Sequence, residues 1–145
     1  MLLGQFHLLL DDDHQLVLPE AFKELFEDGA YVTRGFDQNL LLMNEKEFQA
    51  IYTRVAGLNI ADPLARLLHR LILGNATKIE VRASGRICLP QSLLSLADLE
   101  KEIVLVGQGD YCEAWAPANW EKQTTILLDS AANSARFAQL DLALG

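Results

Sequence analysis

Residues 10–19 have the sequence LDDDHQLVLP, and residues 81–90 have the sequence VRASGRICLP. Each segment is a polar turn followed by a short apolar run that ends in Leu-Pro, and a glycine stands upstream of each, at Gly4 and Gly74. Apolar runs of this length next to a turn predict β-strands. Because the two segments lie about half a chain apart, their likeness predicts a structural unit that occurs twice.

The residues around the first segment predict a definite order of elements. We expect strands over residues 6–10 and 16–18, joined by a turn at 11–14, and then a helix over 19–29. Two further strands over 30–36 and 39–43 and a second helix over 44–57 should follow. Pro19 suits a first helical turn, where its missing N–H has no helical partner, and Gly29 ends that helix. Asn44 and Glu47 have the spacing of a capping box.

The residues around the second segment predict the same order. Strands are expected over residues 76–82 and 86–90, then a short helix, a hairpin of residues 102–107 and 111–115, and a helix that begins at Pro117.

Between the halves, Asp62 and Pro63 predict the start of another helix, which Gly74 ends. Five residues of that helix form one apolar stripe: Leu64, Leu67, Leu68, Leu71 and Ile72. A last, weakly amphipathic helix is expected after Asp129.

Length and composition place limits on the class of protein. A chain of 145 residues is the length of one domain, and 50% hydrophobic with 22% charged residues is typical of globular proteins. Two cysteines are too few for a disulfide framework, and no apolar run approaches the roughly 20 residues that span a bilayer. The N-terminus also lacks the basic region of a signal peptide. These features predict a reduced, cytoplasmic protein with no membrane segment.

The net charge of −8 by itself opposes binding to nucleic acid. The charge is unevenly distributed, however. From Arg66 to Arg86 there are five basic residues and a single acid, Glu80. The sequence therefore allows a local basic surface on an acidic protein.

Motifs for catalysis and for metal binding are missing. The sequence has no nucleophile elbow, no P-loop and no His-Glu-x-x-His, so we expect neither an enzyme nor a cofactor. The run Asp11–Asp13 with His14 has no recognisable spacing of metal ligands, and we expect no metal there. Cys88 alternates with strand residues, which predicts a buried thiol.

The two tandem units resemble the MraZ family of transcriptional regulators from Leu3 to about Leu128. The stretches RLLHRLILGNATKIEV (residues 66–81) and EIVLVGQGDYCEAW (residues 102–115) are very similar to the family's linker helix and second hairpin. The resemblance implies an α+β fold of two tandem, pseudo-symmetric SpoVT-AbrB-like (swapped-hairpin) repeats, which form a small β-barrel-like core with flanking helices. It divides the chain into a first repeat, a linker helix, a second repeat and a C-terminal helix or tail, over residues 3–57, 58–74, 75–128 and 129–145.

The family carries an Asp-x-x-x-Arg motif in each repeat, before the strand that ends in proline. The first copy here runs from Asp11 to Gln15, so the aspartate is kept and the arginine is glutamine. The second runs from Arg82 to Arg86, so the arginine is kept and the aspartate is arginine. Each copy thus retains a different half. The resemblance implies DNA contacts from all four positions, and Arg86 is expected to dominate because its planar fork of donors suits phosphate or guanine.

The resemblance implies a sequence-specific transcriptional regulator that binds double-stranded DNA. The expected target is the promoter of the division and cell-wall gene cluster, contacted at direct repeats by a homo-oligomeric ring in the cytoplasm, associated with the nucleoid. Two other classes stay open: an oligomeric scaffold that has lost DNA binding, and an AbrB-like antitoxin.

Overall fold

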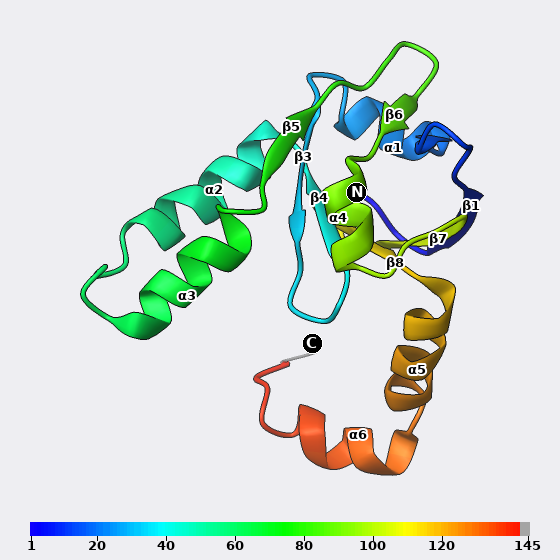
Figure 1. Ribbon diagram of the computed structural model, residues 1–145. Helices are drawn as coiled ribbons and strands as arrows, with labels where there is room; N and C mark the ends of the chain where they lie inside the picture. The colour runs from blue at the N-terminus through cyan, green and yellow to red at the C-terminus, as the bar shows by residue number, and fades with distance from the viewer. Residues whose placement is uncertain (143–145) are drawn as a thin grey trace.

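The computed structural model describes residues 1–142 and shows the same order of elements in both halves of the chain (Figure 1). The first half contains β1 (Gln5–Leu9), β2 (Gln15–Val17), α1 (Glu20–Leu25), β3 (Ala30–Arg34), β4 (Leu40–Met43) and α2 (Glu45–Ala56). The helix α3 (Pro63–Ile72) follows. The second half contains β5 (Thr77–Ile79), β6 (Arg86–Cys88), α4 (Gln91–Leu96), β7 (Glu102–Gly107), β8 (Tyr111–Trp115) and α5 (Pro117–Leu127), and α6 (Ser130–Phe137) comes last. The order of elements predicted from the sequence is confirmed.

The strands of the two halves are interleaved. Six of them form one antiparallel sheet in the order β1-β7-β8-β4-β3-β5, and β2 and β6 form a separate antiparallel pair. The first strand of each half therefore pairs with a hairpin of the other half, β1 with β7 and β5 with β3. Exchanging the two halves leaves the strand order unchanged, so the sheet has an approximate two-fold symmetry. Neither half has a complete sheet without the other.

The α+β class is confirmed, but the prediction of a β-barrel-like core is wrong in one respect. The described strands do not close into a barrel: β1 and β5 are the two edges of an open six-stranded sheet. The chain leaves β1 and β5 through tight turns, and the next strand of each half is only three residues long. These short strands pair with each other and not with the edges, so no ladder closes the sheet.

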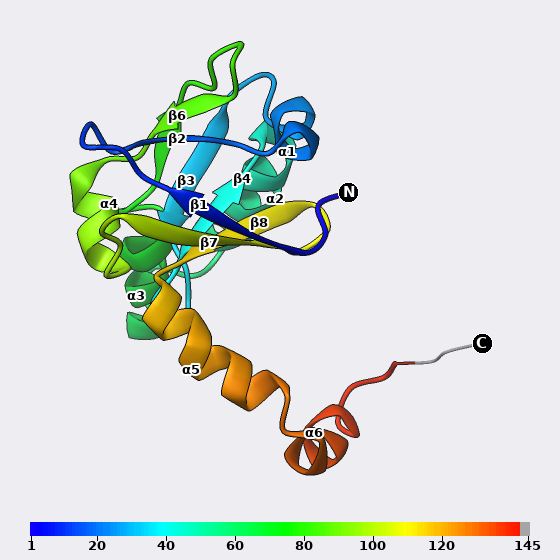
Figure 2. The same ribbon diagram turned by 90° about the vertical axis from the view of Figure 1, so that its right-hand side faces the viewer.

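The main hydrophobic core lies between the large sheet and the β2–β6 pair. In Figure 2 the β2–β6 pair lies above the large sheet, with α1 and α4 at its two ends. Phe22 and Phe26, at the α1 end, are fully buried, and Leu94 of α4 is almost so. Leu16 of β2 and Ile87 of β6 are 2% and 1% exposed, so one side chain from each short strand reaches this core.

The predicted helix starts are confirmed by hydrogen bonds. The Asn44 side chain accepts a bond of 2.9 Å from the backbone N–H of Glu47, and the Asp62 side chain accepts one of 2.9 Å from the N–H of Leu64. Such bonds satisfy backbone donors that have no partner inside a helix. Both helices begin where the sequence places them.

The apolar stripe predicted for α3 is divided in the structure. Ile72 is 2% exposed, and Ala65, which was not assigned to the stripe, is buried at 6%. Leu64 and Leu67 are 73% and 62% exposed. The outer part of this stripe is therefore apolar surface on the described protein.

The two C-terminal helices extend away from the sheet (Figures 1 and 2). Only Trp120 of α5 is buried, and α6 has no buried residue. No helix within residues 1–142 has the length and apolar character needed to cross a bilayer.

Candidate nucleic-acid interface

The turns that precede β2 and β6 have the same backbone hydrogen bonds. In the first turn the N–H of Asp11 donates to the carbonyl of Gln15 over 2.9 Å. In the second the N–H of Arg82 donates to the carbonyl of Arg86 over 3.1 Å. The motif positions of the two copies therefore occupy equivalent places in equivalent turns.

The last residue of each turn has a left-handed backbone. His14 has a φ of 59° and Gly85 a φ of 82°. Glycine adopts this conformation without strain, whereas a residue with a Cβ does so at a cost. The second copy thus has the residue that this turn favours, and the first copy has a histidine in the same place.

Pairing of β2 with β6 brings the two turns together. Leu16 lies opposite Ile87 at the centre of the pair. The N–H of Leu18 donates to the carbonyl of Gly85 over 2.9 Å, and the N–H of Leu89 donates to the carbonyl of His14 over 3.0 Å. Each turn is therefore bonded to the strand of the other half, and the four predicted site residues come from one composite surface.

Asp11 organises this surface. One oxygen of its carboxylate accepts the N–H of Asp13 at 2.9 Å and of Gln15 at 3.0 Å, and the other lies 3.2 Å from Nη1 of Arg86. The N–H of Gln15 is the largest cause that lowers the pKa of Asp11, and smaller contributions come from Asp13 and Arg86. A carboxylate that is held by donors in this way stays charged at neutral pH.

The salt bridge between Asp11 and Arg86 joins the two halves of the chain, and it is partly open to solvent. The side chain of Arg86 is 39% exposed and that of Asp11 is 45% exposed. The sequence alone indicated that each copy had lost half of its motif. The structure shows that the two retained halves meet as one pair across the β2–β6 junction.

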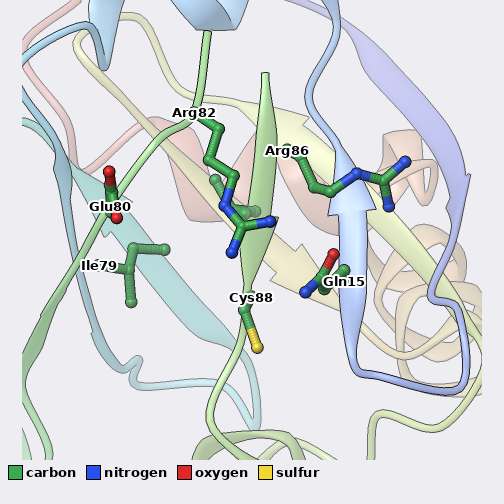
Figure 3. A pocket seen from close by; sticks show the side chains of 7 residues that line it. Gln15, Ile79, Glu80, Arg82, Arg86 and Cys88 are labelled. Atoms are coloured by element: carbon green, nitrogen blue, oxygen red, sulfur yellow. The ribbon is translucent and has the colours of Figure 1, made fainter. Parts of the chain in front are cut away.

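Three of the four motif positions, Gln15, Arg82 and Arg86, border a hollow of about 170 Å³ next to β6 (Figure 3). Figure 3 shows Arg82 extending over this hollow, while the guanidinium of Arg86 points away from that of Arg82. Within residues 1–142 Arg82 has no carboxylate within 4 Å of its guanidinium. The surface therefore contains one paired arginine and one exposed, unpaired arginine beside a neutral amide.

The prediction of a buried thiol at Cys88 is wrong. Cys88 is exposed and borders the same hollow as Arg82, whereas Cys112 is the buried cysteine. On a strand of three residues, Ile87 faces the core, so the side chains on either side of it face outward. The alternation was present in the sequence, but its phase depended on which residue entered the core.

Lys23 of α1 also lies at this surface, although it belongs to neither copy of the motif. A Cβ placed on Gly85 would lie 2.7 Å from Cδ of Lys23, so the lysine stem packs against the second turn. Its ammonium is 3.2 Å from the carboxylate of Glu20. Lys23 is the one base on α1, which is the only signal in the sequence that could have indicated it.

Comparisons with known proteins agree with the resemblance seen in the sequence. Residues 72–141 match the family described as "MraZ protein, putative antitoxin-like". A protein of Thermomicrobium roseum named "Transcriptional regulator MraZ" is 38% identical over 139 residues, which are 96% of each chain. A protein of Herpetosiphon aurantiacus with the same name is 33% identical over 135 residues, which are 93% of this chain and 92% of that one.

Proposed function

This chain belongs to the MraZ family, and we propose that it is a sequence-specific DNA-binding transcriptional regulator. The DNA-binding site is the composite surface of the turns at residues 11–15 and 82–86, and its residues are Asp11, Gln15, Arg82 and Arg86. The relatives' name supports regulation of transcription. The observation that carries the proposal is the meeting of both turns at one exposed surface with two arginines.

The residue types at this surface suit duplex DNA. Arginine can donate two parallel hydrogen bonds to a phosphate or to the O6/N7 edge of guanine, and glutamine can pair with the N6/N7 edge of adenine. The rest of the chain is acidic and repels the phosphate backbone, so binding should be confined to this surface.

We further assign the two halves to tandem SpoVT-AbrB-like swapped-hairpin repeats. The repeats comprise residues 3–57 and 75–128, with a linker helix at 58–74 and a C-terminal helix or tail at 129–145. The exchange of β1 and β5 between the halves supports this assignment. The three last residues lie outside the described part of the chain.

The regulator acts as a homo-oligomeric ring that contacts direct repeats in the promoter of the division and cell-wall gene cluster. One chain presents few base contacts, so several subunits on repeated half-sites would supply the affinity through high effective concentration. The exposed apolar residues Leu64 and Leu67 on α3 and Phe137 on α6 support contacts between copies. A single species of 16.1 kDa in light scattering at micromolar concentration would contradict the ring.

The exposed thiol of Cys88 permits a direct test of the DNA surface. The protein is alkylated with iodoacetamide in the presence of a duplex from upstream of its own gene, and the rate at Cys88 is followed by mass spectrometry. DNA on the composite surface should slow the reaction and should also retard the duplex in a mobility-shift gel.

A scrambled duplex of equal length is the control for sequence specificity. Cys88→Ser checks that the measured alkylation is at that residue, because Cys112 is buried. Retardation without protection of Cys88 would place the DNA elsewhere. No retardation by either duplex would refute the proposed function.

The net charge of −8 favours a second candidate, an oligomeric scaffold that does not bind DNA. That candidate predicts a ring in light scattering together with an unshifted duplex at all salt concentrations. An antitoxin-like role instead predicts a second protein that co-purifies with this chain in a fixed ratio.

A further inference from the structure

We propose that Arg82 and Gln15 form the principal DNA-contacting pair. Arg86 contributes less to DNA binding because its guanidinium is held in a salt bridge with Asp11, which joins the two halves of the chain. The inference rests on the proposed function, because it concerns how the same surface divides its work. It reverses the expectation from the sequence, in which Arg86, the arginine of the motif, dominates the DNA contacts.

The symmetry of the fold defines the comparison. When the two halves are exchanged, Asp11 takes the place of Arg82 and Gln15 takes the place of Arg86, because the two turns have matching hydrogen bonds and β2 pairs with β6 about Leu16 and Ile87. The counterpart of the Asp11–Arg86 pair is therefore the pair of Arg82 and Gln15. The Asp11–Arg86 pair consists of both residues of the motif. In the other pair, Arg82 stands where the motif has aspartate and Gln15 where it has arginine.

The two pairs differ in what they offer to an anion. In the Asp11–Arg86 pair the guanidinium already donates to a carboxylate, and the two charges cancel. A phosphate that approached Arg86 would have to displace Asp11 or accept its repulsion. In the other pair the arginine is accompanied by a neutral amide, so the positive charge of Arg82 is not cancelled by its partner.

The guanidinium of Arg82 has no bonded carboxylate among the described residues. Arg82 is exposed, and no carboxylate within residues 1–142 comes within 4 Å of its guanidinium. Acidic residues do lie farther away: Glu80 borders the same hollow, and Glu20, Glu24 and Glu27 line a neighbouring hollow with Arg82. Gln15 borders the hollow too, and its side-chain amide makes no hydrogen bond to the described residues. A guanidinium and an amide without partners can together bind one phosphate oxygen or a purine edge.

The hydrogen bonds of the first turn give Asp11 a structural role, although its charge opposes DNA. Its carboxylate accepts the N–H groups of Asp13 and Gln15 and thereby shapes the first turn. The same side chain then reaches Arg86 in the other half. Asp11 acts on DNA through Arg86, so it is a positioning residue and does not itself touch DNA.

The test measures affinity for the upstream duplex as a function of salt concentration for the wild type and for Arg82→Gln, Arg86→Gln and Asp11→Asn. Arg82→Gln should weaken binding on the order of tenfold or more, the loss expected for one bidentate interaction. It should also reduce the slope of log affinity against log salt by about 0.9 for each phosphate that the variant no longer neutralises. Arg86→Gln should cause a clearly smaller loss of affinity.

Asp11→Asn should strengthen binding several-fold, because it releases Arg86 while the amide oxygen still accepts the turn's N–H groups. The matched control is Asp12→Asn, which removes the same charge from the neighbouring exposed position and leaves the salt bridge between Asp11 and Arg86 intact. Asp11→Asn should strengthen binding more than this control does. In the Arg86→Gln background the gain from Asp11→Asn should shrink to that of the control, which separates action through Arg86 from a general charge effect.

The possible outcomes separate this inference from the proposed function. A wild type that shifts no duplex refutes the function and the inference together. A wild type that binds, with Arg86→Gln weakening it as much as Arg82→Gln or more, refutes the inference alone. Equal gains from Asp11→Asn and Asp12→Asn would also overturn it, and circular dichroism of each variant establishes that the fold is retained.

Discussion

Replacing Gly85 by alanine should destabilise the protein, because this residue closes the second turn with a φ of 82°. A left-handed backbone costs a residue with a Cβ about 1–2 kcal/mol. Alanine also lowers the entropy of the unfolded chain, which offsets about 0.4–1 kcal/mol of that cost. The new Cβ would also lie 2.7 Å from Cδ and 2.8 Å from Cγ of Lys23, so the lysine side chain would have to shift, which does not reduce the loss. We therefore expect a net loss of about 1 kcal/mol.

The assay is thermal unfolding followed by circular dichroism at one protein concentration, since a concentration change would alter the Tm of an oligomer. For a chain of this length, a loss of about 1 kcal/mol corresponds to a fall in Tm of about 3 °C. Gly57→Ala is the matched control, because Gly57 has an ordinary right-handed φ of −77° at the end of α2. Alanine lowers the entropy of the unfolded chain here too, by about 0.4–1 kcal/mol, and its Cβ would lie 3.2 Å from the carbonyl oxygen of Thr53, so this control should not lose stability as Gly85→Ala does.

His14 occupies the equivalent place in the first turn, with a φ of 59°. His14→Gly should relieve the same strain, but glycine also makes the unfolded chain more flexible, so the two effects should nearly cancel. A Gly85→Ala variant as stable as the wild type, or a Gly57→Ala variant that loses as much, would refute the reasoning from backbone strain.

Three further outcomes are expected. Iodoacetamide should label Cys88 in the native protein without DNA and label Cys112 only after unfolding. Burial raises the pKa of the Cys112 thiol and keeps the reagent from reaching it. Labelling of both cysteines at equal rates would contradict the fold. Asn44→Ala should lower the free energy of unfolding by about 1 kcal/mol through loss of the helix cap, measured in urea. The folded-state pKa of Asp11 lies below its usual 3.8, so its stabilising effect is present above that pH and is lost as the pH falls below it. The stability deficit of Asp11→Asn relative to the wild type should accordingly shrink in acid, and a deficit that grows below pH 3.8 would have the wrong sign.

Local features of the fold were predictable from the sequence, because neighbouring residues determine them. Asn44 and Asp62 cap helices through their own side chains, and the Leu-Pro pairs end the short strands before a helix. The likeness of residues 10–19 and 81–90 was enough to predict two similar series of elements. These statements depend on interactions between residues at most a few positions apart.

The candidate site was only partly predictable. Asp11, Gln15, Arg82 and Arg86 could be named from the spacing of a motif, but the motif indicated two separate and damaged copies. Asp11 and Arg86 are 75 positions apart, and they meet only because β2 and β6 of different halves form one antiparallel pair. The outward direction of Cys88 was not predictable for a related reason: its strand has three residues, and the packing of Ile87 into the core chooses which of them faces inward.

The sequence by itself therefore determined the repeated unit, the starts of the helices, the chemistry of the four turn residues and the family. The tertiary structure decided how those units interlock, with each half completing the sheet of the other. It also decided which arginine is neutralised and which remains open, since that depends on which carboxylate comes within hydrogen-bonding distance. A pattern along the chain specifies the side chains that are available, but the charge that a surface presents depends on distances between residues far apart in the chain, and only the folded backbone sets those distances.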